Sequence, residues 1–380
     1  MSRSDSGEGA PPADEGVGDA AVEGPPADHP VPDGFEATSI AIPDELLDDL
    51  RLRLGHTRWP DELPDVGWDY GTDMSTLQAL CRTWRDTYDW RPTEARLNAW
   101  PQYRTTIGGT PIHVIVARSP EPDAMPLLLT HGWPGSVTEF LDVIEPLRDP
   151  VAHGGDAADA FHVVVPSLPG FGFSGPTTGP GWDVKAVAEA WAELMSRLGF
   201  DRYLAQGGDW GSFVSTWLGL VDPEHLAGIH LNMAVGFPGD GELTESEGVD
   251  LAEMGEFLAN GCAYQEIQGK NPQTLAYGLA DSPAGLAGWI LEKFWAWTDH
   301  DGNLFDAVSE QAVRGALDLL ARSRTTLVIA HRLSTVRSAQ RIIVLEDGRV
   351  VGSGRHSDLI ESCPTYREIV ESQIATEAAA

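Results

Sequence analysis

The segment LAQGGDWGSF, residues Leu204–Phe213, decides the fold of this chain. An apolar run leads into two glycines, a single aspartate, another glycine and the start of an apolar helix. Residues 207–211 fit the pattern G-x-Nuc-x-G, a sharp strand-to-helix turn that lifts its central side chain, here Asp209, clear of a sheet. Glycines are needed because such a turn leaves little room for side chains. Taken alone, the five residues fit equally well a simple turn in which Asp209 caps the helix.

Strands and helices alternate on both sides of this turn. The clearest helix, Asp183–Phe200, has apolar residues recurring every three and four positions, and Gly199 ends it. Apolar strands that alternate with helices predict a parallel sheet covered on both faces. The expected strands are 110–117, 125–132, 161–170, a strand ending at Asp209, and 226–233; the expected helices are 135–147, 183–200 and 211–221.

A second motif, HGWPGS at residues 131–136, follows an earlier strand and opens a helix. With the turn at Asp209, it would let the backbone N–H groups of Trp133 and Trp210 converge on one oxygen and form an oxyanion hole. His131 is expected to order this loop rather than to move protons. The two motifs on successive strands predict an α/β-hydrolase core.

An aspartate at the nucleophile position narrows the chemistry. A carboxylate attacks carbon by displacement, opening a strained ring or expelling a halide, and becomes an alkyl ester. Water then attacks the carbonyl of that ester, and the oxyanion hole stabilises the tetrahedral oxyanion. Amide and ester substrates are therefore disfavoured, and epoxide hydrolysis or haloalkane dehalogenation remains.

Residues Phe35 to Phe305 resemble the microsomal-type epoxide hydrolases, including their N-terminal domain. The resemblance rests on WPDELPDVGWDYG (59–71), SPEPDAMPLLLTHGWPGSVTEF (119–140), PSLPGFGFSG (166–175), GGDWGS (207–212) and ADSPAGLAGWILEKF (280–294). It implies conversion of a small hydrophobic epoxide to a vicinal diol without a cofactor, with Asp209 as nucleophile and the Trp133 and Trp210 N–H groups as oxyanion donors. A haloalkane dehalogenase has no reason to carry the N-terminal domain.

By the same resemblance, Tyr264 in the segment AYQEIQGKNPQT is the proton donor to the epoxide oxygen. A ring that opens to an alkoxide needs an acid, and a well-placed phenol can serve. The alternative is that Tyr264 only packs in the cap. Tyr277 is the nearby competitor and is expected to be a packing residue.

The last part of the chain breaks this resemblance. Residues 306–380 resemble the C-terminal end of an ABC-transporter ATPase, in which His331 would be the switch histidine. ATP binding is not expected, because no G-x-x-x-x-G-K-[ST] loop is present. Composition changes at the same place, since all 13 tryptophans precede residue 298. The sequence therefore predicts an epoxide-hydrolase front grafted onto a short foreign α/β segment.

The graft removes the acid and the histidine that complete the hydrolase triad near the C-terminus. Turnover is then in doubt, and we expect the Asp209 ester to form but to stall. His331, at the end of the predicted strand TTLVIAH, is the surrogate base that the tail offers. The remaining alternative is a catalytically dead chimera that acts as an interaction protein.

Composition and charge disfavour several other classes of protein and partner. The net charge of −33 disfavours nucleic acid and anionic membranes as partners. The three cysteines have no metal-like spacing, no metal is expected, and no apolar run is long enough to span a membrane. We expect a cytoplasmic protein. Its predicted regions are a disordered tail (1–34), an N-terminal epoxide-hydrolase domain (35–105), the front half of the hydrolase core (106–235), a partial cap (236–305) and the ATPase-like fragment (306–380).

Overall fold

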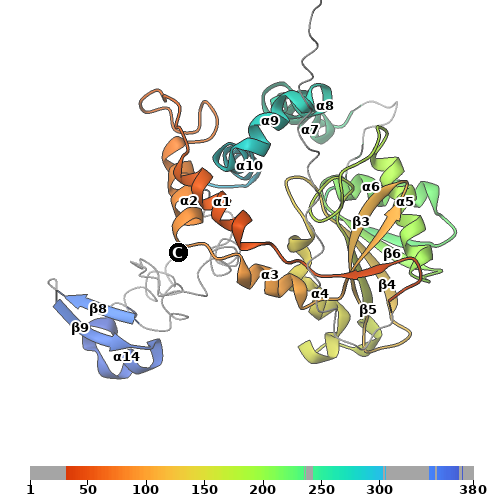
Figure 1. Ribbon diagram of the computed structural model, residues 1–380, viewed down its shortest axis with the longest axis horizontal. Coiled ribbons are helices and arrows are strands. Elements are labelled where there is room, and N and C mark those ends of the chain that lie inside the picture. The colour runs from red at the N-terminus through yellow and green to blue at the C-terminus, as the bar shows by residue number, and fades with distance from the viewer. Residues whose placement is uncertain are drawn as a thin grey trace, which may run out of the picture. The chain divides into compact units, whose positions relative to one another are not determined.

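The computed structural model describes residues 31–234, 236, 243–302, 304, 342–346, 349–367 and 370. The chain divides into two compact units, Met1–Ser323 and Arg324–Ala380. All the elements that surround Asp209 belong to the first unit (Figure 1).

The first unit is built on a seven-stranded sheet with the order β1-β2-β3-β5-β4-β6-β7. The strands are β1 (Glu36–Thr38), β2 (Gln102–Ile107), β3 (Thr110–Ala117), β4 (Met125–Thr130), β5 (Phe161–Pro166), β6 (Tyr203–Gly207) and β7 (Leu226–Leu231). The four strands from β5 to β7 are parallel, as expected from the alternation of strands and helices. The sheet has the mixed form of the predicted α/β-hydrolase core.

The expectation of a wholly parallel sheet is wrong on one side. Strands β1, β2 and β3 pair antiparallel, and β3 pairs antiparallel with β5. Strands β2 and β3 form a hairpin in which Ile107 pairs with Thr110, so Gly108 and Gly109 make the two-residue connection. Both glycines have positive φ (57° and 78°), which is the backbone that a tight hairpin of this length requires. No strand is predicted from the sequence before residue 110.

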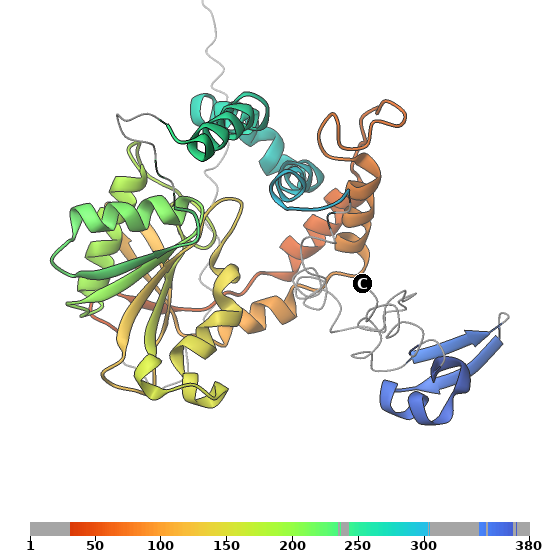
Figure 2. The ribbon, with the colours of Figure 1, turned by 180° about the vertical axis from the view of Figure 1, so that it is seen from behind.

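Helices cover both faces of the sheet. On one face lie α5 (Val184–Arg197) and α6 (Trp210–Val221), and on the other α3 (Arg91–Asn98) and α4 (Leu141–Arg148) (Figure 2). Successive strand residues serve opposite faces: Leu128 packs with α5 and α6, whereas Leu127 and Leu129 pack with α3 and α4. The buried sheet thus supports the turn at Asp209 from both sides.

Helix α5 begins and ends where its sequence signals predict. The Asp183 carboxylate accepts a hydrogen bond from the Ala186 N–H at the N-terminus, and Gly199 follows the helix with a φ of 80°. Trp191, which the sequence predicts to be a core residue rather than a binding group, is fully buried.

We expect Asp183→Ala to lower the free energy of unfolding by about 1 kcal/mol, because the first turn of α5 loses its side-chain cap. Thermal unfolding followed by circular dichroism measures the change. Lys185→Ala, in the same turn but exposed, is the control and should change stability by less than about 0.5 kcal/mol. Equal effects of the two substitutions would contradict the capping role.

The N-terminal helices pack against the cap. Helices α1 (Asp44–Gly55) and α2 (Met74–Asp86) meet α10 (Pro283–Trp297) through Leu54, Cys81 and Ala284, which form a small buried cluster. The Trp68 and Trp295 rings stack with centroids 4.3 Å apart. The remaining cap elements are α7 (Glu245–Glu256), the π-helix η4 (Phe257–Gly261), α8 (Ala263–Lys270) and α9 (Pro272–Asp281).

Three histidines, His113, His162 and His230, lie inside strands predicted from the sequence, and each is expected to be a satisfied core residue; the outcomes differ. His113 and His162 are buried in β3 and β5, as expected of core histidines. His230 in β7 is exposed, so the same expectation is wrong for this residue. Among the described strands β7 pairs only with β6, and its outer residues therefore lack a covering neighbour.

In the second unit, β8 (Ile342–Glu346) and β9 (Arg349–Gly354) form an antiparallel hairpin that is followed by α14 (His356–Ser362). Leu359, Cys363, Tyr366 and Val370 form its small core. His331 and the strand predicted at TTLVIAH lie outside the described residues. None of the helices in the described ranges is long and apolar enough to cross a membrane.

Candidate active site

Asp209 occupies a strained turn between β6 and α6. Its φ is 48° and its ψ is −126°, a backbone conformation that costs energy for a residue with a side chain. A side chain at Gly207 would come within 2.7 Å of the Ser212 nitrogen, and one at Gly211 within 2.8 Å of the Thr130 carbonyl carbon. The glycines predicted from the turn pattern are thus required by close backbone packing.

The HGWPGS loop lies directly over the Asp209 carboxylate. The Trp133 N–H donates a hydrogen bond of 2.7 Å to Asp209 Oδ1. Gly132 allows this approach, because a Cβ there would lie 2.6 Å from Asp209 Cγ. His131 holds the loop: its Nδ1 lies 3.0 Å from the Gly132 carbonyl oxygen and its Nε2 accepts the Leu168 N–H at 3.1 Å. Burial lowers the pKa of His131, so the ring is neutral and both of its nitrogens are engaged.

Trp210 is the first residue of α6 and follows Asp209 directly. In the described part of the chain no acceptor is bonded to its N–H, as expected at the first turn of a helix. The structure therefore brings the Trp133 N–H to Asp209. The N–H of Trp210, the residue after Asp209, has no hydrogen-bond acceptor among the described residues.

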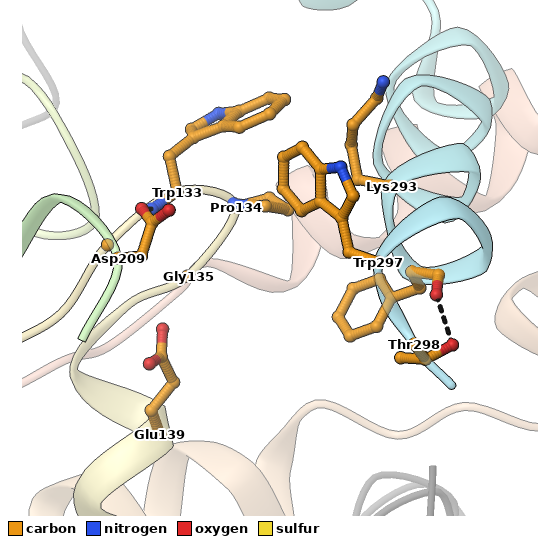
Figure 3. Close-up of a pocket in the computed structure, with 10 residues that line it drawn as sticks. Trp133, Pro134, Gly135, Glu139, Asp209, Lys293, Trp297 and Thr298 are labelled. Carbon is orange, nitrogen blue, oxygen red and sulfur yellow. Dashed lines mark hydrogen bonds between the residues drawn. The ribbon is translucent and has the colours of Figure 1, made fainter. Parts of the chain in front are cut away.

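A cavity of about 330 Å³ opens next to Asp209. Trp133, Pro134, Phe294 and Trp297 supply its apolar walls. The Trp133 and Trp297 rings meet edge to face with centroids 6.1 Å apart, and Figure 3 shows both rings next to Pro134. The ionisable side chains that line it are those of Asp209, Glu139 and Lys293. Such a cavity suits a small apolar molecule that carries few polar atoms.

Tyr264 lies in α8 beside the cavity rather than in its wall. Its ring stacks on Trp133 with centroids 5.4 Å apart and meets Trp297 edge-on at 5.3 Å. The Lys293 ammonium lies 4.3 Å from the centre of the Tyr264 ring and pairs with Glu292. Burial, followed by nearby negative charge that includes Asp209 and Glu292, raises the pKa of Tyr264, so the phenol is protonated at neutral pH. Tyr277 is 70% exposed, which leaves the expected packing role unsupported.

Glu139 is a site residue that the sequence analysis missed. It belongs to the 3₁₀ turn η1 (Val137–Phe140), and its Oε1 accepts the Ser136 N–H at 3.0 Å in a capping box. Its carboxylate points toward the space below Asp209 (Figure 3). The sequence signal for Glu139 is the pattern Ser-x-x-Glu after the oxyanion loop. This pattern is also typical of an ordinary helix N-terminus, so it did not single out Glu139 as a site residue.

His331 lies outside the described residues, and the described histidine whose pKa responds to Asp209 is His131. No group of three or more His, Cys, Asp or Glu side chains that could hold a metal ion occurs among the described residues.

A mixed sheet covered by helices, with an aspartate on the β6–α6 turn and a loop N–H bonded to its carboxylate, defines an α/β-hydrolase. A family model described as the epoxide hydrolase N terminus matches residues 35–140, and a model of the alpha/beta hydrolase fold matches residues 125–258. The chain belongs to the epoxide hydrolase family.

The chain is 49% identical over 289 residues to a putative epoxide hydrolase of Stigmatella aurantiaca, covering 75% of this chain and 66% of that protein. It is 34% identical over 348 residues to epoxide hydrolase 1 of Sus scrofa, covering 86% of this chain and 76% of the pig protein. The solved Aspergillus niger epoxide hydrolase aligns with a TM-score of 0.64 and 32% identity over 78% of this chain and 77% of that chain. The chain thus spans slightly less than two thirds of the Stigmatella relative and about three quarters of the other two.

Proposed function

We propose that this chain opens epoxides through an ester on Asp209, the first half of the conversion of an epoxide and water to a vicinal diol. The supporting observation is the strained backbone of Asp209, which holds its carboxylate at the cavity with Oδ1 bonded to the Trp133 N–H. A backbone held at a positive φ by packing on both sides fits a residue whose side chain is used in a reaction.

In the proposed ring opening, Asp209 Oδ2 attacks an epoxide carbon, because Oδ1 is already held by Trp133. A C–O bond forms to Asp209 as the ring C–O bond breaks. The ring oxygen then takes the proton of the Tyr264 hydroxyl, which the raised pKa keeps in place at neutral pH. The nearby Lys293 ammonium favours the phenolate that results.

The later attack of water on the ester would place negative charge on the oxygen held by Trp133. That N–H, joined by the unoccupied N–H of Trp210, would form the oxyanion hole. A small hydrophobic epoxide is the proposed substrate because aromatic side chains form most of the cavity wall.

The test is the intact mass of the purified chain before and after incubation with styrene oxide. A mass gain of one epoxide molecule, mapped by peptide analysis to Asp209, is the expected result, with or without release of diol. A chain that forms neither adduct nor diol would overturn the proposal. Release of chloride from chloroalkanes in place of epoxide opening would assign it to dehalogenation.

We expect Tyr264→Phe to slow ring opening by about 10²- to 10⁴-fold, because the alkoxide then forms without its proton donor. The stacking of the ring on Trp133 is kept in this variant. The rate of epoxide disappearance at pH 7 measures the effect, and Tyr277→Phe is the exposed control. Ring opening at the unaltered rate in Tyr264→Phe would assign Tyr264 to packing alone.

For the tail we infer descent from the C-terminal end of an ABC-transporter ATPase, on the sequence resemblance of residues 306–380. Neither of the two family models matches residues beyond 258. ATP binding is not part of the proposal, because the chain has no phosphate-binding loop. A cleared lysate passed over immobilised ATP should leave the chain in the flow-through.

A further inference from the structure

We propose that Glu139 is the general base that activates water for hydrolysis of the Asp209 ester. The inference rests on the proposed ester and supplies the group that its second half-reaction needs. It replaces His331 as the candidate base, since Glu139 lies in the same cavity as Asp209.

The geometry places both carboxylates against one short loop. A Cβ added to Gly132 would lie 2.6 Å from Asp209 Cγ, and one added to Gly135 would lie 2.8 Å from Glu139 Cδ. Two glycines three positions apart therefore each let one carboxylate approach the loop, and both carboxylates line the same cavity. Figure 3 shows the Glu139 side chain rising toward the space between them. A water bound in this space would contact Glu139 and face the carbonyl carbon of an ester on Asp209.

One oxygen of Glu139 is fixed and the other is available. Oε1 accepts the Ser136 N–H at 3.0 Å, and this capping box sets the direction of the side chain. No hydrogen bond to Oε2 is found among the described residues, and Glu139 is an exposed residue. Oε2 is thus held near Asp209 with a free lone pair for a water proton.

The surrounding charges favour a base that becomes active after ring opening. Loss of water around the carboxyl, and then the negative charge of Asp209, raise the pKa of Glu139 to about 7, a shift that its solvent-exposed part moderates by screening. Lys293, the other ionisable group of the cavity wall, pairs with Glu292, and His131 behind the loop is neutral. Esterification removes the charge of Asp209. The pKa of Glu139 must then fall, so the carboxylate form gains population when water has to be activated.

Hydrolysis of the ester proceeds by addition of water and then loss of the diol. A water oxygen bonds to Cγ of the Asp209 ester as Glu139 Oε2 takes a water proton, and the Trp133 N–H stabilises the oxyanion. The tetrahedral intermediate then expels the diol oxygen, which recovers a proton from Glu139. The products of this step are a diol, a protonated Asp209 and an ionised Glu139. The proton left on Asp209 returns to the Tyr264 phenolate formed in ring opening, which restores both groups.

Glu139→Gln tests the proposal in the full chain, with styrene oxide as the probe. The amide oxygen of glutamine can still accept the Ser136 N–H, so the capping box is kept while the base is lost. The Asp209 adduct should form at the unaltered rate but decay at least about 10²-fold more slowly. Rapid quench with intact-mass detection measures both rates, and Glu145→Gln on the neighbouring helix is the matched control.

A pH profile separates a base from a merely structural residue. In the unaltered chain, ester breakdown should rise with pH through a midpoint between 4.5 and about 7, and this rise should disappear in Glu139→Gln. Glu139→Asp, which restores a carboxylate, should recover part of the rate. Thermal unfolding provides a check on folding: because the folded state favours the protonated form, stability of the unaltered chain should fall as pH rises through this range, and Glu139→Gln should lack that loss.

The outcomes are distinct. Adduct decay in Glu139→Gln at the unaltered rate, or a persistent adduct in the unaltered chain, would overturn the role of Glu139 and leave ring opening intact. Slow decay in His331→Ala with normal decay in Glu139→Gln would assign the base to the tail. Failure of the unaltered chain to form adduct or diol would overturn both this inference and the proposed function.

Discussion

Asp209→Asn should lower the rate of epoxide consumption by about 10⁴-fold or more, the scale on which removal of a catalytic nucleophile acts. The neutral amide is a poor nucleophile toward carbon. It nevertheless keeps the shape of the side chain and can accept the Trp133 N–H through its oxygen. The loss should therefore appear in the first half-reaction, with no mass gain after incubation with styrene oxide.

Asp201→Asn, an exposed aspartate just before β6, is the control for this experiment. It should open epoxide at the unaltered rate. An adduct of normal yield in Asp209→Asn would show that another side chain is alkylated, and the proposed nucleophile would then be wrong.

Gly211→Ala should lower the free energy of unfolding by about 3 kcal/mol or more. The added methyl group would lie 2.8 Å from the Thr130 carbonyl carbon and 3.1 Å from the His131 oxygen, and both are backbone atoms of the neighbouring strand and loop. Because neither can rotate away, α6 must move off the sheet. Thermal unfolding should show a fall in Tm of about 5 °C or more.

Gly208→Ala is the matched control for this substitution, in the same turn. The nearest atoms to its added Cβ belong to Asn232 at 3.7 Å or more, and its backbone φ is not positive. It should change the free energy of unfolding by less than about 1 kcal/mol. Destabilisation of both variants to the same degree would mean that any side chain disrupts the turn, whatever its backbone contacts.

Prediction from sequence succeeded where the signal is local. The turn at residues 207–211, the start of one helix at Asp183 and its stop at Gly199 depend on a few neighbouring residues, and each lies where expected. The prediction failed for the β2–β3 hairpin, because most of the segment that forms β2 was assigned to the helical N-terminal region. It also failed for His230, since exposure of β7 depends on which strands lie beside it.

The residues of the candidate site were likewise predictable where a local motif marks them and not where only spatial proximity does. The family was indicated by long motifs and is confirmed by the comparisons, whereas the roles of Asp209, Tyr264, Trp133 and Trp210 stay predictions. The base was sought after the cap, where the hydrolase order places a histidine. Glu139 stands only three residues after the oxyanion loop, and its helix-start pattern concealed its place beside Asp209.

The sequence by itself determined the α/β-hydrolase core, the family and the identity of the aspartate on its turn, because glycine spacing and apolar periodicity are local properties of the chain. Only the tertiary structure decided that a second carboxylate shares the cavity and that Tyr264 stacks on the loop residue Trp133. These relations join residues 70 or more positions apart, and packing of the loop, the turn and the cap sets them. No spacing along the chain encodes that packing.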